Sequence, residues 1–206
     1  MASTTSLLDA IAHRRTVYDL QPTSPIHDAR IVEIVHHITL HVPSSFNCQS
    51  ARFVVLFRGE HQRLWDHARD IMEKVLPSTV FSTYFEPMIA KYHKGYGTIL
   101  CFEDQDSVAE LKKQYEGIIT PEKFEQWSEH SAGMHQFALW CALEAEGMGA
   151  NLQHYNPHID EMVRKIWNVS PGWSLKAQLV FGTPEKHTER KKEAKPLEER
   201  VLVKGG

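Results

Sequence analysis

The stretch PSSFNCQS at residues 43–50 runs into RFVVLF at residues 52–57, and this junction decides most about the fold. The first part packs hydroxyls and amides into a short loop, which can surround a hydroxylated ligand with donors and acceptors. It can equally be a turn whose Asn and Ser side chains bond their own backbone, and both interpretations stay open. The second part is apolar on both faces, which predicts a central strand covered on both sides.

Outward from this strand, apolar residues at helical spacing and helix-start signals predict most of the chain to be helical. The first expected helix runs from Ser6 to about Arg14, with Leu7, Leu8 and Ile11 on one face, and the second starts at Asp28 and carries Ile31, Ile34, Val35 and Ile38. The longest expected helix is Pro121–Gly147, with Phe137, Trp140, Cys141 and Leu143 facing inward. The other expected helices are His61–Leu76, Val108–Tyr115 and His158–Trp167.

Two further buried strands are expected, at Gly97–Phe102 and Ser174–Phe181. Residues 78–95 stay unassigned, because Pro87 limits any helix there. Helices outnumber strands and do not alternate cleanly with them, which argues against a doubly wound sheet. The predicted fold class is therefore α+β, with a few-stranded sheet wrapped by helices.

The last part of the chain is an arm dense in charge, from residue 185 to residue 195, that ends in Val201-Leu202-Val203. A lone apolar triplet after such an arm reads as a short strand that needs a sheet to join. Ten extended residues reach about 33 Å, enough to cross to another subunit. We therefore expect a single domain over residues 1–206, with residues 185–206 as an extended C-terminal arm.

The composition and net charge of the chain argue against several classes of protein. The chain has 206 residues, a formal net charge of -3 and three widely spaced cysteines. This charge argues against a general nucleic-acid binder, and an odd, sparse cysteine count indicates free thiols in a reducing compartment. The N-terminus lacks the apolar run of a signal peptide, and no segment approaches the roughly 20 apolar residues of a membrane span. A cytoplasmic or nucleocytoplasmic location is expected, with no membrane partner.

The segment His-Arg-Arg-Thr at residues 13–16 is the clearest anion-binding candidate. Arginine donates in a fixed fork that suits phosphate oxygens, and the hydroxyl adds a neutral donor. The alternative is that basic residues in a last helical turn simply favour the C-terminal end of the helix dipole. In the tail, Arg190, Lys191, Lys192 and Lys195 form a solvated arm from which one or two side chains could complete an anion site.

The segment GMGANLQHY at residues 147–155 follows the longest expected helix. Its small residues could let a flat ring approach the backbone, or one of its glycines could simply be a helix C-cap. The sequence does not fit GxGxxG, so a Rossmann site is not expected. No metal site is expected either: HExxH is absent, and the pairs His37/His41 and His154/His158 lack an evident third ligand. Neither a GxSxG elbow nor a Cys–His pair points to hydrolysis.

Four of these segments, taken in order, resemble the nitroreductase family. Arg-Arg-Thr lies near the N-terminus, and Pro-Ser-Ser-Phe-Asn-Cys-Gln precedes a strand. The Gly-rich turn follows the central helix, and the basic arm ends in Pro-Leu-Glu-Glu at residues 196–199. The resemblance runs from about Leu7 to Val203. The form Gly-Ala-Asn-Leu-Gln-His-Tyr-Asn at residues 149–156, with Tyr-Gly-Thr-Ile-Leu at residues 96–100, is similar to a fungal and bacterial nitroreductase-like subgroup.

This resemblance implies a nitroreductase-like fold with a mixed sheet, FMN bound at the interface of a homodimer, and a C-terminal strand exchanged between subunits. The basic segment would reach the flavin phosphate, the ribityl chain and the pyrimidine edge, and the polar loop would come from the opposite subunit. The Gly-rich turn would lie along the flavin ring and direct a backbone N–H toward N5. The implied FMN-binding residues are Arg14, Arg15 and Thr16; Pro43, Ser44, Ser45, Asn47 and Gln49; Leu152, Gln153, His154 and Tyr155; and Lys195 with Lys191 or Lys192, of which Lys192 is preferred.

The resemblance also implies an enzyme that takes electrons from NADH or NADPH and reduces nitroaromatic or quinone-type acceptors by a ping-pong mechanism. No side chain need act as an acid or base. Arg15 is the candidate cation beside N1 and O2 of the reduced flavin. Phe46, Tyr84 or Phe85 could stack on flat acceptors, and the alternative for each of them is packing in the core. The alternative is a flavin-binding sensory or regulatory protein with little turnover.

Two departures from the family pattern concern the flavin pyrimidine. Many relatives carry a lysine two residues after the hydroxyl of the basic segment, and here Tyr18 stands at that position. An Asn-x-x-Lys pair common in the middle of relatives is also not evident. Lys91 or Lys94 could replace its lysine.

Overall fold

Strands from distant parts of the chain form one sheet in the computed structural model, which describes residues 5–186 and 193–205. Its strand order is β1-β5-β3-β2, and β4 also pairs with β5. All of these pairings are antiparallel, and a parallel contact occurs only at the isolated bridge between Thr16 and Ala150. The α+β class is thus confirmed, and within the described chain the sheet is mixed only at that bridge. The strands are β1 Leu20–Gln21, β2 Ala51–Phe57, β3 Gly97–Asp104, β4 Gly149–Gln153 and β5 Trp173–Pro184.

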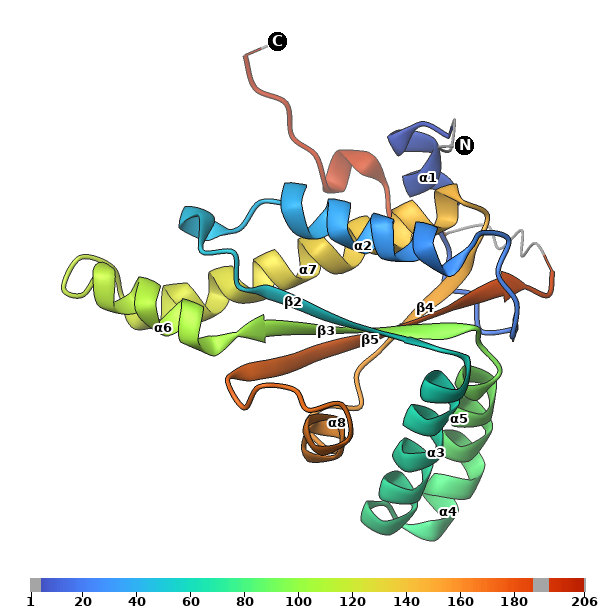
Figure 1. The fold of residues 1–206 in the computed structure, drawn as a ribbon. Helices are drawn as coiled ribbons and strands as arrows, with labels where there is room; N and C mark the ends of the chain where they lie inside the picture. Colours follow the sequence, from blue (N-terminus) through green and yellow to red (C-terminus); the bar gives the residue numbers. More distant parts are fainter. Residues whose placement is uncertain (1–4, 187–192, 206) are drawn as a thin grey trace.

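Helices cover both faces of this sheet (Figure 1): α1, α2 and α7 lie on one face, and α3, α5 and α8 lie on the other. The helices are α1 Leu7–His13, α2 Asp28–His41, α3 Arg58–Val75, α4 Ser78–Val80, a π-helical turn at Phe81–Phe85, α5 Glu86–His93, α6 Gln105–Gln114, α7 Pro121–Ala145 and α8 Asp160–Ile166, with 3₁₀ turns at Ser45–Asn47 and Leu197–Glu199. Ser6 caps α1 as expected, because its Oγ accepts from the Asp9 N–H at 3.2 Å.

The sheet divides the core into two clusters. β3 is buried along its whole length, and its side chains alternate between the two clusters. Leu100 and Phe102 pack with Trp65 of α3, whereas Ile99 and Cys101 pack with Leu139 of α7. This period of two is what a strand between two helical layers requires.

β2 is an edge strand, so the expectation of a central position was wrong. Its side chains are apolar on both faces because α2 and α7 contact one face and α3 contacts the other, although no further strand of the described chain pairs beyond it. β1 and β4 were not anticipated. Of the unassigned residues 78–95, those from Ser78 to His93 form three helical pieces, and Pro87 lies in the first turn of α5, where a proline is tolerated.

Several apolar side chains of the predicted helices are exposed, among them Phe137, which was expected to face inward. Leu7 and Leu8 of α1 are 70% and 76% exposed, and Phe137 of α7 is 43% exposed. α1 packs on α7, and both helices carry further apolar side chains on their outward faces. Val201–Val203 is exposed and pairs with none of the described strands, so the expected C-terminal strand does not form among the residues that the structure describes. Among the described helices, none combines the length and the apolar character that a membrane crossing needs.

Gly97 gives a test of how tightly β3 is packed. A Cβ at this position would lie 2.4 Å from Cζ of Phe181 and 2.7 Å from the carbonyl oxygen of Leu56. We expect Gly97→Ala to lower the free energy of unfolding by about 1–3 kcal/mol, the usual range for overpacking a core, as measured by urea unfolding. Gly133→Ala is the control: nothing lies within 4 Å of a Cβ there, and alanine within α7 should raise stability by about 0.5–1 kcal/mol. An unchanged unfolding midpoint for Gly97→Ala would contradict this packing.

Candidate functional site

The basic segment leaves α1 and runs alongside β4. Arg14 is the C-cap of α1, and its N–H donates to the Ala10 carbonyl. Thr16 then bridges to Ala150, and the Val17 N–H donates to the Ala150 carbonyl at 3.0 Å. From β4, Nδ2 of Asn151 donates to the Val17 carbonyl at 2.8 Å. Residues 14–16 and the start of β4 therefore form one continuous surface.

Within this segment, the two arginines have different roles. Nη1 of Arg15 donates to the carbonyls of Ala12 and Arg14, at 2.6 and 2.9 Å, so the helix-end interpretation holds for Arg15. The guanidinium of Arg14 instead lies over the ring of Trp140, 4.5 Å from its centroid. Nε of Arg14 is buried without a hydrogen-bond partner, and Arg14 forms no ion pair with any described residue. A buried, unpartnered cationic donor is what a bound anion would satisfy.

The Gly-rich segment divides into a cap and a strand. Gly147 has a φ of +81°, its N–H donates to the Glu144 carbonyl, and the Met148 N–H donates to the Leu143 carbonyl. This is a Schellman C-cap of α7, so the cap interpretation is confirmed for Gly147. Gly149 opens β4, and a Cβ there would lie 2.9 Å from Cδ2 of Leu20. At Gly149 the close approach to the backbone is therefore made by Val17 and Leu20 of the N-terminal segment.

The residues that follow form one wall of a pocket of about 480 Å³. Nε2 of Gln153 donates to Oδ1 of Asn151, and the Tyr155 N–H donates to Oε1 of Gln178 at 2.8 Å. The Tyr155 N–H is therefore used within the chain. The pocket is lined by Met72, Leu76, Tyr84, Phe85, Met88, Tyr92, Gln153, His154, Tyr155, Asn156 and His158.

Aromatic side chains form much of the lining of this pocket. Tyr84 and Phe85 line the pocket. Phe46 lies elsewhere in the fold, where its ring centroid is 4.6 Å from that of Tyr115. Burial raises the pKa of Tyr92 to about 12 and also raises the pKa of Tyr155. Both phenols therefore stay protonated at neutral pH, and the pocket presents flat apolar surface with neutral polar groups at its edge.

A second, smaller pocket of about 230 Å³ adjoins the basic segment. Nζ of Lys91 lies 2.9 Å from Oδ1 of Asp19 there, and Tyr18 also lines the pocket beside Thr16. Lys94 is the C-cap of α5 and does not line it. Of the two lysines considered, Lys91 is the one that faces the basic segment. The lining comprises Thr16, Val17, Tyr18, Asp19, Lys91, Glu185 and Lys186.

The polar loop at residues 43–50 has an unusual backbone. Phe46, Asn47 and Gln49 have φ values of +52°, +54° and +50°, which disfavour non-glycine residues. Oγ of Ser44 accepts from the Gln49 N–H at 2.9 Å, so the turn interpretation is confirmed for Ser44. Asn47 and Gln49 are exposed, as is Pro43, whereas Ser44 and Ser45 are half-buried. The loop thus combines a constrained backbone with amides open to solvent.

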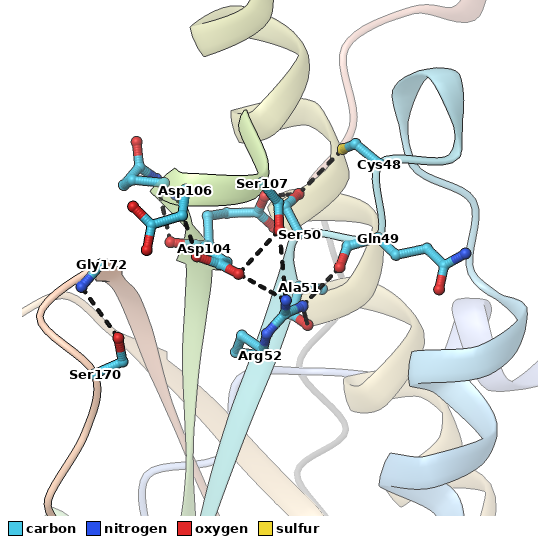
Figure 2. Close-up of polar contacts among 12 residues, drawn as sticks. Cys48, Gln49, Ser50, Ala51, Arg52, Asp104, Asp106, Ser107, Ser170 and Gly172 are labelled. Carbon is cyan, nitrogen blue, oxygen red and sulfur yellow. Dashed lines mark hydrogen bonds and ion pairs between the residues drawn. The ribbon is translucent and has the colours of Figure 1, made fainter. Parts of the chain in front are cut away.

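Contacts with β3 hold this loop in place (Figure 2). Arg52 donates to the Gln49 carbonyl at 2.6 Å and to Oδ2 of Asp104 at 2.7 Å, and Ser50 donates to the buried Glu103 carboxyl at 2.5 Å. Burial raises the pKa of Glu103, against hydrogen bonds from Ser50 and Ser128 that favour its charged form. The strained turn is therefore supported by an ion pair and a buried carboxyl at its C-terminal end.

One chain does not bring these segments together. Figure 1 shows the loop between α2 and β2 at one end of the sheet, with α1 and β4 toward the other end. Lys195 is exposed and makes no hydrogen bond or ion pair with another described residue. Lys192, Lys191 and Arg190 lie outside the described residues. Of the predicted FMN-binding segments, the single chain places residues 14–16 beside the start of β4, the strand that continues into residues 152–155, and leaves the polar loop apart.

Sequence reasoning missed three side chains of this region. Trp140 was assigned to helix packing, Asp19 was not considered, and Gln178 was seen only as part of a strand. The interactions of all three depend on residues more than 20 positions away in the chain, and no local pattern signals such contacts.

Comparison with known proteins shows which family the chain is similar to. The sequence profile of the nitroreductase family matches residues 11–183. The nitroreductase FRM2 of Saccharomyces cerevisiae is 31% identical over 195 residues, covering 93% of this chain and 94% of the yeast protein. The nitroreductase CinD of Lactococcus lactis, solved in complex with nicotinic acid, is 33% identical with a TM-score of 0.85, covering 97% of this chain and 100% of CinD.

CinD has also been solved with chloramphenicol and with 4-nitrophenol, at TM-scores of 0.86 and 0.83. A more distant protein of Desulfovibrio desulfuricans, solved in complex with FMN, shares the fold at 18% identity and a TM-score of 0.67, with 99% of each chain covered. The family match spans most of the chain, and relatives above 30% identity cover nearly all of it. The chain therefore belongs to the nitroreductase family of oxidoreductases.

Proposed function

We propose that the protein binds FMN across the interface of a homodimer and uses NADH or NADPH to reduce nitroaromatic or quinone-type acceptors by a ping-pong mechanism. The observation that carries this proposal is Arg14, whose buried Nε has no hydrogen-bond partner, in the segment beside the strand that leads into the larger pocket. The chain would act as a single FMN-binding domain, with residues 185–206 as an arm.

The residues present fit FMN. Arg14 would hold the phosphate, and Thr16 with Lys91 would face the pyrimidine edge, where a cation favours the anionic reduced form. Arg15 would act through the end of α1, because its Nη1 already donates to two carbonyls there. Leu152, Gln153, His154 and Tyr155 would lie along the ring, and Lys195 with Lys192 would return to the phosphate. Hydride transfer itself is chemistry that FMN supplies when bound.

A second subunit would supply the remaining part of the site. Because the polar loop lies apart from Arg14 in one chain, Pro43, Ser44, Ser45, Asn47 and Gln49 would reach the FMN held by the opposite subunit. The exposed apolar side chains on the outer faces of α1 and α7 offer a surface for pairing. By strand exchange, the apolar triplet Val201–Val203 would pair with the sheet of the opposite subunit. A strand edge is available for such pairing, because β2 pairs only with β3 among the described strands.

The larger pocket supports flat aromatic acceptors. Tyr84, Phe85 and Met88 provide apolar and polarisable surface, and Gln153 and His154 provide polar groups at the rim. CinD binds chloramphenicol and 4-nitrophenol, which are both nitroaromatics, and nicotinic acid, which shares its ring with nicotinamide. For a protein with these properties and three free cysteines, we propose a cytoplasmic or nucleocytoplasmic location.

An absorption spectrum with an NADH and NADPH titration tests the proposed function. We expect a yellow protein that releases FMN on denaturation, is bleached by one of the two donors under anaerobic conditions, and is reoxidised by 4-nitrophenol or a quinone. A colourless protein that cannot be reconstituted with FMN would reject the proposal. A flavoprotein that neither donor reduces would favour the sensory or regulatory alternative.

A further inference from the structure

Trp140 of α7 carries an N–H group that the fold leaves unused. Its Nε1 is buried and has no hydrogen-bond partner, and the guanidinium of Arg14 lies over its ring. Among the described residues, Nε of Arg14 and Nε1 of Trp140 are the only buried side-chain nitrogens without a partner. Both belong to the same stacked pair, although residues 14 and 140 are far apart in the chain.

Two such donors in one place indicate a missing acceptor. More than about 90% of buried polar groups in folded proteins are hydrogen-bonded, and an unsatisfied buried donor costs roughly 1–3 kcal/mol. Neither nitrogen can accept a hydrogen bond in its protonated form, so the two groups cannot satisfy each other. One acceptor next to the stacked pair would relieve both.

The charges around the pair indicate that this acceptor is an anion. Arg14 carries a positive charge without an ion pair in the described chain, and its charge opposes the burial that raises the pKa of the neighbouring Cys141. Stacking on the indole keeps the guanidinium plane in a fixed orientation, which suits an acceptor with several oxygens. A phosphomonoester offers three strong acceptor oxygens, one for the arginine and another for the indole.

We propose that Trp140 is a phosphate ligand, whose indole N–H donates to the same phosphoryl group that Arg14 binds. This inference rests on the proposed function for the identity of the ligand, which is then the phosphate of FMN. Trp140 would thereby help the protein to discriminate FMN from riboflavin, which shares the ring system and lacks the phosphate. Its role is in binding, with no part in hydride transfer.

Trp140→Phe tests the proposal, because phenylalanine keeps an aromatic ring under Arg14 and removes only the N–H. We expect the Kd for FMN, measured on apoprotein by quenching of flavin fluorescence, to rise about tenfold, equivalent to one hydrogen bond to a charged group of about 1.4 kcal/mol. The Kd for riboflavin should not change. Trp167→Phe is the matched control: it also removes an indole N–H, here donated to Glu60 at 2.8 Å, and should leave both constants unchanged.

Inorganic phosphate separates this proposal from the proposed function. Phosphate should raise the thermal midpoint of the wild-type apoprotein and of Trp167→Phe, but raise it less in Trp140→Phe. If FMN fails to bind while phosphate shows this pattern, the proposed function is rejected and the anion site stands. An equal loss of FMN and riboflavin affinity in Trp140→Phe, or no loss of either, would overturn the proposal and assign the N–H to water or to a partner carbonyl.

A measurement on the wild-type protein keeps the proposal falsifiable if Trp140→Phe does not fold. The chain has five tryptophans, so the indole N–H region of a ¹⁵N-correlated NMR spectrum is simple. One of these resonances should move downfield when phosphate is added to the apoprotein. The absence of any indole shift at saturating phosphate would overturn the assignment.

Discussion

Replacing Arg14 with alanine is expected to weaken FMN binding about 100-fold while changing the stability of the apoprotein by less than about 1 kcal/mol. A hydrogen bond to a charged group contributes roughly 1.5–3 kcal/mol, and an arginine fork can make two. The interaction lost within the chain is the stack on Trp140, which is worth about 0.5–1 kcal/mol at a partly exposed site. FMN fluorescence titration and urea unfolding of the apoprotein measure the two effects separately.

Arg63→Ala is a suitable control for this prediction. Arg63 lies on α3, and its side chain is half exposed and 3.7 Å from Glu60, so its removal should affect neither quantity by much. If Arg14→Ala loses flavin affinity and folding stability in equal measure, Arg14 serves α1 as a helix-end cation. Its buried Nε would then have no ligand to explain it.

The contribution of a single histidine, His61, to the stability of the fold should fall by about 3 kcal/mol between pH 7 and pH 4. Its side chain is fully buried, with Nδ1 2.8 Å from Oγ1 of Thr98 and Nε2 3.3 Å from the His93 carbonyl. Burial lowers the pKa of His61 to about 4 from its ordinary 6.5. Thr98 also accepts from Nε1 of Trp65, so its own hydroxyl proton is free to donate to Nδ1 of the neutral imidazole.

The direction of this effect follows from proton linkage. Below pH 6.5 the unfolded chain binds a proton at residue 61 that the folded chain does not bind until about pH 4. The contribution of His61 is therefore fully present above pH 6.5 and is lost as the pH falls toward 4, at 1.36 kcal/mol for each unit of difference in pKa.

Urea unfolding from pH 4 to pH 7 measures this slope. His61→Gln should flatten it, and His36→Gln, which replaces an exposed histidine of α2, should keep the wild-type slope. A wild-type slope in His61→Gln would assign the acid sensitivity to other groups.

Local sequence signals predicted elements whose determinants lie within a few residues. The capping of α1 by Ser6, the strand at residues 52–57 and the C-cap at Gly147 are of this kind. β4 was missed because Gly-Ala-Asn-Leu-Gln has little intrinsic strand preference and becomes a strand by pairing with β5. The edge position of β2 was missed because apolar residues on both faces of a strand indicate only that helices cover both faces. Helices can cover both faces of an edge strand as well as those of a central one.

The candidate site shows the same division. The segment of residues 14–16 was recognisable, yet only the path of the chain after α1 separates Arg15, which bonds the end of the helix, from Arg14, which faces Trp140. The choice of Lys91 over Lys94 likewise needed the position of Asp19, 72 residues earlier in the chain. Both choices depend on tertiary contacts, which propensity and spacing do not encode.

The separation of the polar loop from the basic segment has a consequence for the evolution of this chain. In the proposed dimer, a substitution at Asn47 and one at Arg14 would alter the same cavity, although the two residues never meet within one molecule. Selection would then couple these positions, and their statistical covariation across descendants would record a contact between molecules. A distance restraint derived from that covariation and imposed on a single chain would pull the two ends of the sheet together and distort a correct fold.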